Sequence, residues 1–432
     1  MLDRLVVRFN DRLVGELFRE EKERISLRYD KSWCDDYHEG KAFPISLSLP
    51  IISPEMKLDA TTYVAGLLPD SPHHRETLIH ELGLLDDDTD FALISRMGRD
   101  NAGALCIIPD GEVMSDKRPD VEWLTIPELA EHVRSLPRRP LLLDDDQGIV
   151  LSLAGVNDKA AVVVKNGRIG LPRNGYPSTH IIKIDIPGLE DSIKTEHFGL
   201  MLARSVGLRA PKARIYEAED QTFMLMARYD RTFNGDNQPI RLHQEDFCQA
   251  LGFHPKQKYE RHGGPGWPEV FKIMSRCVNP TEARAELLRN FAFQFLFGNP
   301  DAHAKNYSVL YSGDAGSLYP APIYDLNNAA AFRHKFKKTR PIMAMSIGDQ
   351  MDRDAVTEDD FRLFAKRCGF RHEFVMKNIR VMAEQIVDKM ERARELSSSC
   401  QAVDDAITDI MERSRSWAVG HDRRVEENIS PI

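Results

Sequence analysis

Hydrophobic and polar positions alternate along the start of the chain, as they do in strands that bury one face. Leu2–Phe9 and Leu13–Phe18 both alternate, and Asn10-Asp11 between them is a turn signal, so this pattern predicts a hairpin. A turn over residues 66–71 precedes a predicted helix, which begins near Ser71-Pro72 and ends at about Leu82.

Strand patterns return from residue 149. The dipeptide Asn166-Gly167 separates two β-rich runs and is a strong hairpin signal. The amphipathic run Thr195–Val206 ends at Gly207, which predicts a helix with a glycine C-cap. The strands predicted around these features are Ile149–Leu153, Ala160–Lys165, Arg168–Leu171, His180–Ile184, Ala213–Glu217 and Phe223–Tyr229.

Helical spacing dominates from Gln244 onward. The predicted helices cover about residues 244–251, 267–276, 281–297, 358–368 and 372–397. On the longest helix we expect the apolar positions to lie in the core, namely Phe374, Val375, Ile379, Met382, Ile386 and Met390. Along the chain, a group of strands with one helix is followed by a group of helices, and this order predicts a two-lobed α+β fold. Protein kinases have this layout, and so do many other α+β proteins.

A chain of 432 residues is long enough for several domains. We expect a β-rich N-terminal subdomain over residues 1–110 and a connector over 111–148. A β-rich lobe would follow over 149–240, and an all-helical lobe over 241–432.

Composition and charge exclude several classes of protein. No segment approaches 18 continuous apolar residues, and the start lacks the apolar block of a signal peptide, so no membrane span or membrane partner is expected. The six cysteines are scattered without a C-x-x-C pair, so the sequence indicates neither a zinc site nor a disulfide framework. This pattern fits a protein of the reducing cytoplasm. The net charge of −9 means that any contact with nucleic acid would have to be local.

The stretch Gly-Asn-Pro-Asp-Ala-His-Ala-Lys-Asn at residues 298–306 carries the strongest candidate chemistry. It places Asp301 five residues before Asn306, and Asp325 follows after Tyr324. Protein kinases use D-x-x-x-x-N and a later Asp in this order, as the acid–base and the two Mg²⁺ ligands. Turn formation is the alternative for the Asp and Asn residues, because both satisfy local backbone groups near proline. His303 would then be a packing residue.

Two further residues occur at the kinase positions upstream. Lys183 lies in an apolar strand, where it would bind the ATP phosphates, and Glu196 in the next helix would be its ion-pair partner. The alternatives are an edge-strand lysine that reaches water and a solvated glutamate in the first helical turn. The small-residue loop Ser152–Lys159 could cover phosphates or be an ordinary hairpin loop. The agreement in order and spacing favours an ATP- and Mg²⁺-dependent kinase.

The basic run Arg333–Arg340 follows Asp325, where kinases carry an activation segment. It could contact a polyanion or an acidic substrate. Exposed charge runs are more often solvated surfaces.

The chain resembles the HipA family, the serine/threonine kinase toxins of bacterial type II toxin–antitoxin modules. The similarity extends over nearly the whole length. The segments that carry it are residues 66–71, 98–104, 152–159, 179–183, 228–231, 244–249, 263–266 and 301–306, together with Tyr324-Asp325.

This resemblance implies a two-lobed protein-kinase-like fold and a role for each matching residue. Asp301 would be the catalytic acid–base, Asn306 and Asp325 the Mg²⁺ ligands, and Lys183 the ATP lysine. The phosphate-covering loop would comprise Ala154, Gly155, Val156, Asn157, Asp158 and Lys159. The rest of the nucleotide pocket would be the hinge residues Ala227, Arg228 and Tyr229, with His303, Ala304, Lys305 and Tyr324. Ser152 matches the serine whose autophosphorylation switches the family's kinases off.

The resemblance also implies partners. The best-known substrate of the family is glutamyl-tRNA synthetase, whose phosphorylation halts growth and promotes persistence. The cognate antitoxin, HipB, is a helix-turn-helix dimer that binds operator DNA and bridges two toxin copies. Residues 352–361, at the DNA-contacting position, are mostly acidic here, so DNA is expected mainly through the antitoxin, unless Lys335, Lys337 and Lys338 take over this contact.

Two other functions stay open at this point. One is a catalytically weak co-repressor subunit that works only by binding its antitoxin on DNA. The other is a phosphotransferase that acts on small molecules.

Overall fold

The computed structural model describes residues 3–10, 12–111, 120–137, 159–333, 335 and 342–419. The chain forms two compact units, each built from separate segments. The first unit comprises Met1–Ile186, Ala213–Lys258 and Ser308–Ala321, and the second Pro187–Lys212, Tyr259–Tyr307 and Pro322–Ile432. Our four domain boundaries stay a prediction.

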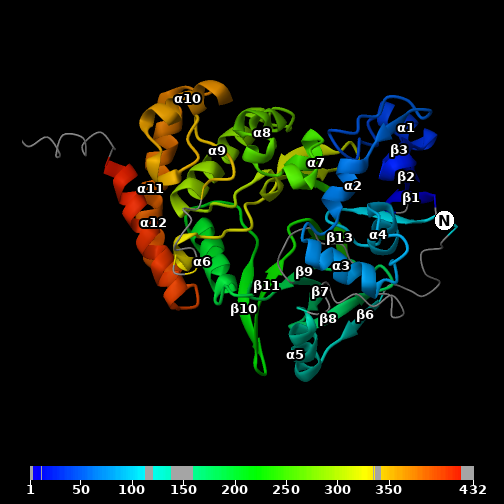
Figure 1. The fold of residues 1–432 in the computed structure, drawn as a ribbon, viewed down its shortest axis with the longest axis horizontal. Coiled ribbons are helices and arrows are strands. Elements are labelled where there is room, and N and C mark those ends of the chain that lie inside the picture. Colours follow the sequence, from blue (N-terminus) through cyan, green and yellow to red (C-terminus); the bar gives the residue numbers. More distant parts are fainter. Residues whose placement is uncertain are drawn as a thin grey trace, which may run out of the picture. The chain divides into compact units, whose positions relative to one another are not determined.

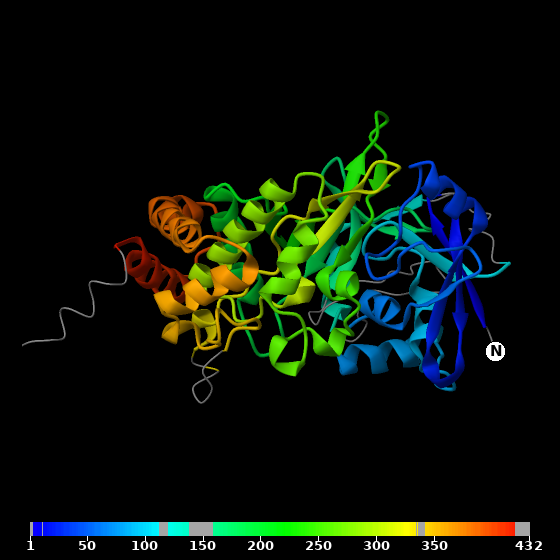
Figure 2. The ribbon, with the colours of Figure 1, turned by 90° about the horizontal axis from the view of Figure 1, so that it is seen from above.

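A five-stranded antiparallel sheet, with strand order β4-β3-β2-β1-β5, organises the start of the first unit, and its first four strands are blue in Figure 2. The predicted hairpin is confirmed: β1 pairs with β2, and Asn10 at the turn has a φ of 52°. The neighbouring strand comes so close to Gly15 that a Cβ there would lie 2.2 Å from the Arg28 carbonyl oxygen. The strands are β1 (Arg4–Phe9), β2 (Arg12–Arg19), β3 (Ile25–Tyr29), β4 (Lys57–Asp59) and β5 (Leu105–Pro109).

Four helices accompany this sheet: α1 (Lys31–His38), α2 (Thr61–Leu67), α3 (Pro72–Glu81) and α4 (Asp90–Met97). Helix α3 confirms the predicted helix after Ser71. The Ser71 side chain accepts a hydrogen bond from the His74 amide, and Pro72 occupies the first turn, where no intrahelical donor is needed.

A six-stranded sheet in the order β10-β11-β9-β7-β8-β6 forms the second part of the first unit (Figure 1). The Asn166-Gly167 hairpin is confirmed, and both residues have positive φ, as a tight hairpin turn requires. Helix α5 (Ile126–Ser135) packs on β10 and β11. The strands are β6 (Asp120–Trp123), β7 (Lys159–Lys165), β8 (Arg168–Arg173), β9 (His180–Lys183), β10 (Ala213–Ala218) and β11 (Gln221–Ala227).

The helix predicted over residues 244–251 is only partly correct, because its first three residues form strand β14. Asp246 ends the strand and caps α7 (Phe247–Leu251) in a capping box with Gln249, so the helix begins one residue later. Two small sheets complete the first unit: β12 (Arg231–Phe233) with β13 (Pro239–Arg241), and β14 (Gln244–Asp246) with β15 (Ser308–Ser312) and β16 (Ser317–Pro320).

The described residues of the second unit form helices and no named strand. Figure 1 shows α11 and α12 side by side in orange and red, and α10 packs on α11. Stacked aromatic rings hold α9 and α10 together, since Phe291 and Phe364 lie 4.4 Å apart between centroids. The helices are α6 (Ser192–Ser205), α8 (Trp267–Met274), α9 (Pro280–Phe297), α10 (Glu358–Cys368), α11 (His372–Glu395) and α12 (Gln401–Val419).

Helix α11 confirms the predicted core positions, except that Phe374 is 41% exposed. Helix α12 was not predicted. Gly207 has the left-handed φ of 84° expected at the end of α6. Within the described ranges, no helix combines the length and the apolar character that crossing a membrane requires.

Candidate active site

Helix α9 leads directly into the loop predicted to carry the catalytic acid. Gly298 ends the helix with a φ of 81° and donates its amide hydrogen bond to the Gln294 carbonyl. A Cβ at this position would lie 2.2 Å from the Arg353 guanidinium, so any other residue would displace the end of that side chain and strain the left-handed backbone. The chain therefore turns sharply into Asn299.

Asn299 connects the two ends of the candidate site. Its side-chain oxygen accepts a hydrogen bond from the Asp301 amide at 3.0 Å. Its side-chain nitrogen donates to the Asp325 carbonyl and to Oε1 of Gln294, both at 3.0 Å. Because Asn299 is buried, these bonds are shielded from water and fix the backbones of Asp301 and Asp325 to each other.

Asn306 closes the predicted catalytic loop on itself. Its side-chain nitrogen donates a 2.7 Å hydrogen bond to the Asp301 carbonyl, which also accepts from the His303 amide at 2.8 Å. The buried turn Ala304–Asn306 follows. Since its nitrogen is directed at Asp301, the amide oxygen of Asn306 is the atom suited to a cation.

Asp325 has a φ of 58°, an uncommon backbone conformation for a residue with a side chain. The hydroxyl of the preceding Tyr324 donates to the Lys305 carbonyl at 2.9 Å. The structure thus brings Asp301, Asn306 and Asp325 into one hydrogen-bonded loop system.

Oxygen donors are what a magnesium ion prefers, and the Asn306 amide oxygen and the Asp325 carboxylate supply them. Over the ranges that the structure describes, His, Cys, Asp and Glu side chains form no metal-holding group of three or more.

A residue missed by the sequence analysis contacts the predicted acid–base. The Tyr259 hydroxyl donates a hydrogen bond of 2.5 Å to Oδ1 of Asp301. These residues are far apart in the sequence, and no local pattern links them. Asn299 was also missed, because an Asn before a Pro usually indicates an ordinary turn.

Lys183 is buried at the end of β9, which lies between β11 and β7. The edge-strand alternative is therefore wrong. Lys159 on β7 lies directly opposite Lys183, so two lysine side chains leave the same face of the sheet. Like charges at such a position repel each other unless an anion is near them.

Glu196 is buried within α6 of the second unit, so a solvated glutamate in the first helical turn is also excluded. Its pairing with Lys183 of the first unit stays a prediction. Ser152 and Ala154–Asp158 lie outside the described residues, and so does most of the basic run. In that run, Arg333 pairs with Asp409 and Lys335 with Glu190.

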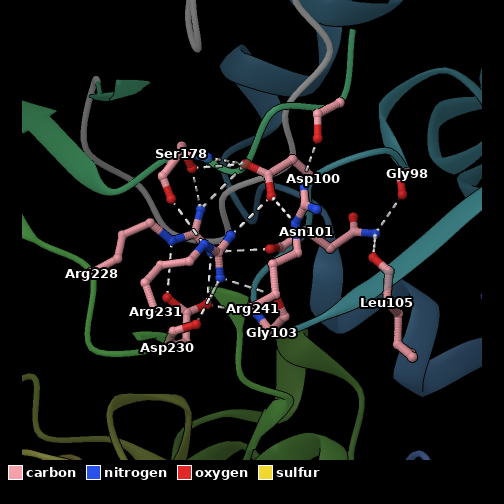
Figure 3. Close-up of polar contacts among 11 residues, drawn as sticks. Gly98, Asp100, Asn101, Gly103, Leu105, Ser178, Arg228, Asp230, Arg231 and Arg241 are labelled. Carbon is pink, nitrogen blue, oxygen red and sulfur yellow. Dashed lines mark hydrogen bonds and ion pairs between the residues drawn. The ribbon is translucent and has the colours of Figure 1, made fainter. Parts of the chain in front are cut away.

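Two side chains of the predicted hinge Ala227–Tyr229 are already engaged, and one of them is Tyr229, whose hydroxyl donates to the Gln244 side chain. Figure 3 shows three arginines converging on Asp100 and Asp230. Arg228 donates to both oxygens of Asp230, and its backbone amide bonds to Thr179. The Arg228 side chain and its backbone amide are therefore both engaged within the first unit.

This buried ionic cluster joins residues 98–103 to the strand region around Arg228 and Arg231 (Figure 3). Arg231 and Arg241 contact Oδ1 of Asp100 at 2.9 and 2.8 Å. Burial alone would raise the pKa of Asp100, but the three arginines hold it well below its ordinary value. The carboxylate is therefore ionised at any physiological pH.

Two family models match this chain. The model of the HipA N-terminal domain covers residues 5–108, and that of the HipA-like C-terminal domain covers residues 151–393. The second match alone spans more than half of the chain.

Relatives match nearly full length. The chain is 32% identical over 400 residues to Y4mE of Sinorhizobium fredii, a kinase by name, covering 91% of this chain and 92% of the relative. It is 26% identical over 395 residues to the serine/threonine-protein kinase toxin HipA of Shewanella oneidensis, covering 88% and 87%. The solved structure of Shewanella oneidensis HipA with HipB and operator DNA superposes with a TM-score of 0.82 at 24% identity, covering 99% of this chain and 100% of that one. The kinase-like α+β fold is thereby confirmed.

Proposed function

Because this chain belongs to the HipA family of serine/threonine-protein kinase toxins, we propose that it transfers the γ-phosphoryl group of ATP to serine or threonine hydroxyls of proteins. The observation that carries this proposal is the hydrogen-bonded loop system around Asn299. It joins the acid–base position, Asp301, to the metal-ligand position, Asp325.

In this reaction Asp301 orients the attacking hydroxyl and accepts its proton, while the hydroxyl oxygen bonds to the γ-phosphorus. The bond from that phosphorus to the bridging oxygen breaks, and ADP leaves. Asn306 and Asp325 would hold Mg²⁺, which supplies neutralising charge at the phosphates. Lys183 and Lys159 would bind phosphate oxygens, and Glu196 would orient Lys183.

The remaining nucleotide contacts are proposed for Ala154–Asp158, for Ala227–Tyr229 through main-chain groups, and for His303, Ala304, Lys305 and Tyr324. Lys183 is buried directly opposite Lys159 on the neighbouring strand, and this pairing of two lysines supports a shared role at an anionic ligand.

We further propose that the chain acts in the bacterial cytoplasm as the toxin of a toxin–antitoxin pair. Its relative from Shewanella oneidensis was solved with HipB and operator DNA, which favours a HipB-like helix-turn-helix partner here. Operator DNA would be bound mainly through that partner. The protein substrate would be a translation factor, with glutamyl-tRNA synthetase the first to test.

Autophosphorylation of Ser152 would inactivate the kinase. A phosphoserine carries about −1.5 to −2 charge and would leave the loop's docked position for cationic or N–H partners. This proposal makes Ser152 the regulatory residue of the chain.

The test is incubation of the purified protein with Mg²⁺ and labelled ATP. Wild type should label itself on Ser152, Asp301→Asn should lose the labelling, and Ser152→Ala should lose only that site. An unlabelled wild type from several antitoxin-free preparations would contradict the kinase proposal and favour a co-repressor subunit. Labelling of small molecules in place of protein serine would favour a small-molecule phosphotransferase.

A further inference from the structure

Tyr259 contacts the proposed acid–base from a distant part of the chain. It lies 42 positions before Asp301, at the start of a short turn that leads to α8. Its hydroxyl donates to Oδ1 of Asp301 at 2.5 Å. A hydrogen bond to an ionised carboxylate is shorter and stronger than one between neutral groups.

The Tyr259 ring is held in place by its neighbours. His303 meets it edge to face with centroids 5.2 Å apart, and His262 does so at 5.5 Å. The Arg261 guanidinium lies over the ring, 4.5 Å from its centre. These contacts restrict the ring, so the hydroxyl has a defined position relative to Asp301.

The backbone of Tyr259 is fixed as well. Its carbonyl oxygen accepts hydrogen bonds from the amides of His262 and Gly264, at 2.9 and 3.1 Å. The next residue, Glu260, donates its amide to the Ala344 carbonyl and accepts from the Ser346 hydroxyl. The turn is therefore anchored to the segment that follows Asp325.

We propose that Tyr259 is a positioning residue for Asp301. By donating to Oδ1, the phenol fixes the orientation of the carboxylate that accepts the proton of the acceptor hydroxyl. The inference rests on the proposed kinase function and adds a residue to its machinery.

The prediction is that Tyr259→Phe, which removes only the hydroxyl, slows phosphoryl transfer without weakening nucleotide binding. A misplaced catalytic group costs on the order of 10²-fold in rate, so a fall of about 10- to 100-fold is expected at saturating ATP. The ATP concentration at half-maximal rate should stay within about twofold of the wild-type value. The rise in melting temperature that Mg²⁺-ATP causes should also stay within about twofold of the rise in wild type.

Tyr176→Phe is the matched control. Its phenol also donates a side-chain hydrogen bond, to Gln238 at 3.2 Å, but in the first unit. This variant should transfer phosphate at the rate of wild type. The readout is the initial rate of self-labelling by labelled ATP in all three proteins, with circular dichroism to show that each is folded.

Five outcomes are distinguishable. A slow Tyr259→Phe with unchanged nucleotide affinity supports the inference. A variant as fast as an active wild type overturns it, and a faster one shows that the phenol obstructs the acceptor position. Phosphotyrosine at residue 259 would make Tyr259 an acceptor and also overturn it. If wild type and Tyr176→Phe are both inactive, the proposed function fails, and the inference fails with it.

Discussion

The side-chain amide of Asn299 bonds to the Asp325 carbonyl, while its oxygen accepts from the Asp301 amide. One uncharged side chain thus sets the spacing between the proposed acid–base and a proposed metal ligand. Asp325 has a left-handed backbone conformation, and the bond to its carbonyl helps to hold it there.

Asn299→Ala should therefore impair catalysis more than stability. We expect a fall in phosphoryl transfer on the order of 10²-fold, because both backbones lose their common tether. The Mg²⁺ concentration at half-maximal rate should rise. Asn279→Ala is the control, since Asn279 caps the far end of the same helix. It should cost about 1 kcal/mol of unfolding free energy and leave the Mg²⁺ dependence unchanged.

Gly199 of α6 packs directly on the segment that carries Asp325. A Cβ at residue 199 would lie 2.8 Å from the side chains of both Leu326 and Phe297. Gly199→Ala is expected to destabilise the protein by about 1–3 kcal/mol through overpacking, measured by urea denaturation. Gly235→Ala has open space around it and should change the free energy of unfolding by less than about 0.5 kcal/mol. Equal effects of the two substitutions would contradict the packing argument.

Asp100 is the buried carboxylate on which Arg231 and Arg241 converge. Asp100→Asn leaves these guanidinium groups without their counter-charge, so we expect a loss of about 3–5 kcal/mol in unfolding free energy. Asp35→Asn removes the exposed pair with Lys31 and should cost less than about 1 kcal/mol. Thermal melting of both variants at high and low salt checks this. Only the Asp35 variant should differ from wild type in a salt-dependent way.

Glu245 gives the first unit a pH-dependent stability. Burial raises its pKa to about 7, although the Ser46 hydroxyl, the Leu47 amide and the Tyr311 hydroxyl all donate to it. As pH rises from about 4.5 to 7, the unfolded chain releases this proton while the folded chain retains it, so stability falls. Over this pH range the free energy of unfolding should fall by about 3 kcal/mol.

Glu245→Gln cannot titrate and should abolish this slope. Measured by urea denaturation at pH 5 and pH 8, wild type should lose stability relative to the variant at the higher pH. Parallel stability curves for the two proteins would show that Glu245 does not titrate in this range.

The spacing of polar residues singled out Asp301, Asn306 and Asp325, because a D-x-x-x-x-N motif and a following Asp are visible in the sequence itself. The structure brings these three residues into one hydrogen-bonded loop system, and their catalytic roles stay predictions. Tyr259 was missed because its role depends on a hydrogen bond to Asp301, 42 positions further along the chain, and such a contact has no local signature. Strand β14 was mistaken for helix because Gln244–Asp246 pair with a distant strand. Helix α12 was missed although Ala402, Ala406, Ile410 and Trp417 are buried along it.

The path of the chain between the two units affects how the protein can be made. Strand β14 pairs with β15, and the paired residues Asp246 and Ser308 are 62 positions apart, across a segment that belongs to the other unit. At about 5–20 residues per second, a ribosome needs roughly 3–12 s to deliver the partner strand. Until then β14 presents unpaired backbone groups. A nascent chain truncated before residue 308 should therefore bind chaperones well. Because each unit is built from separate segments, neither unit is encoded by one continuous part of the gene.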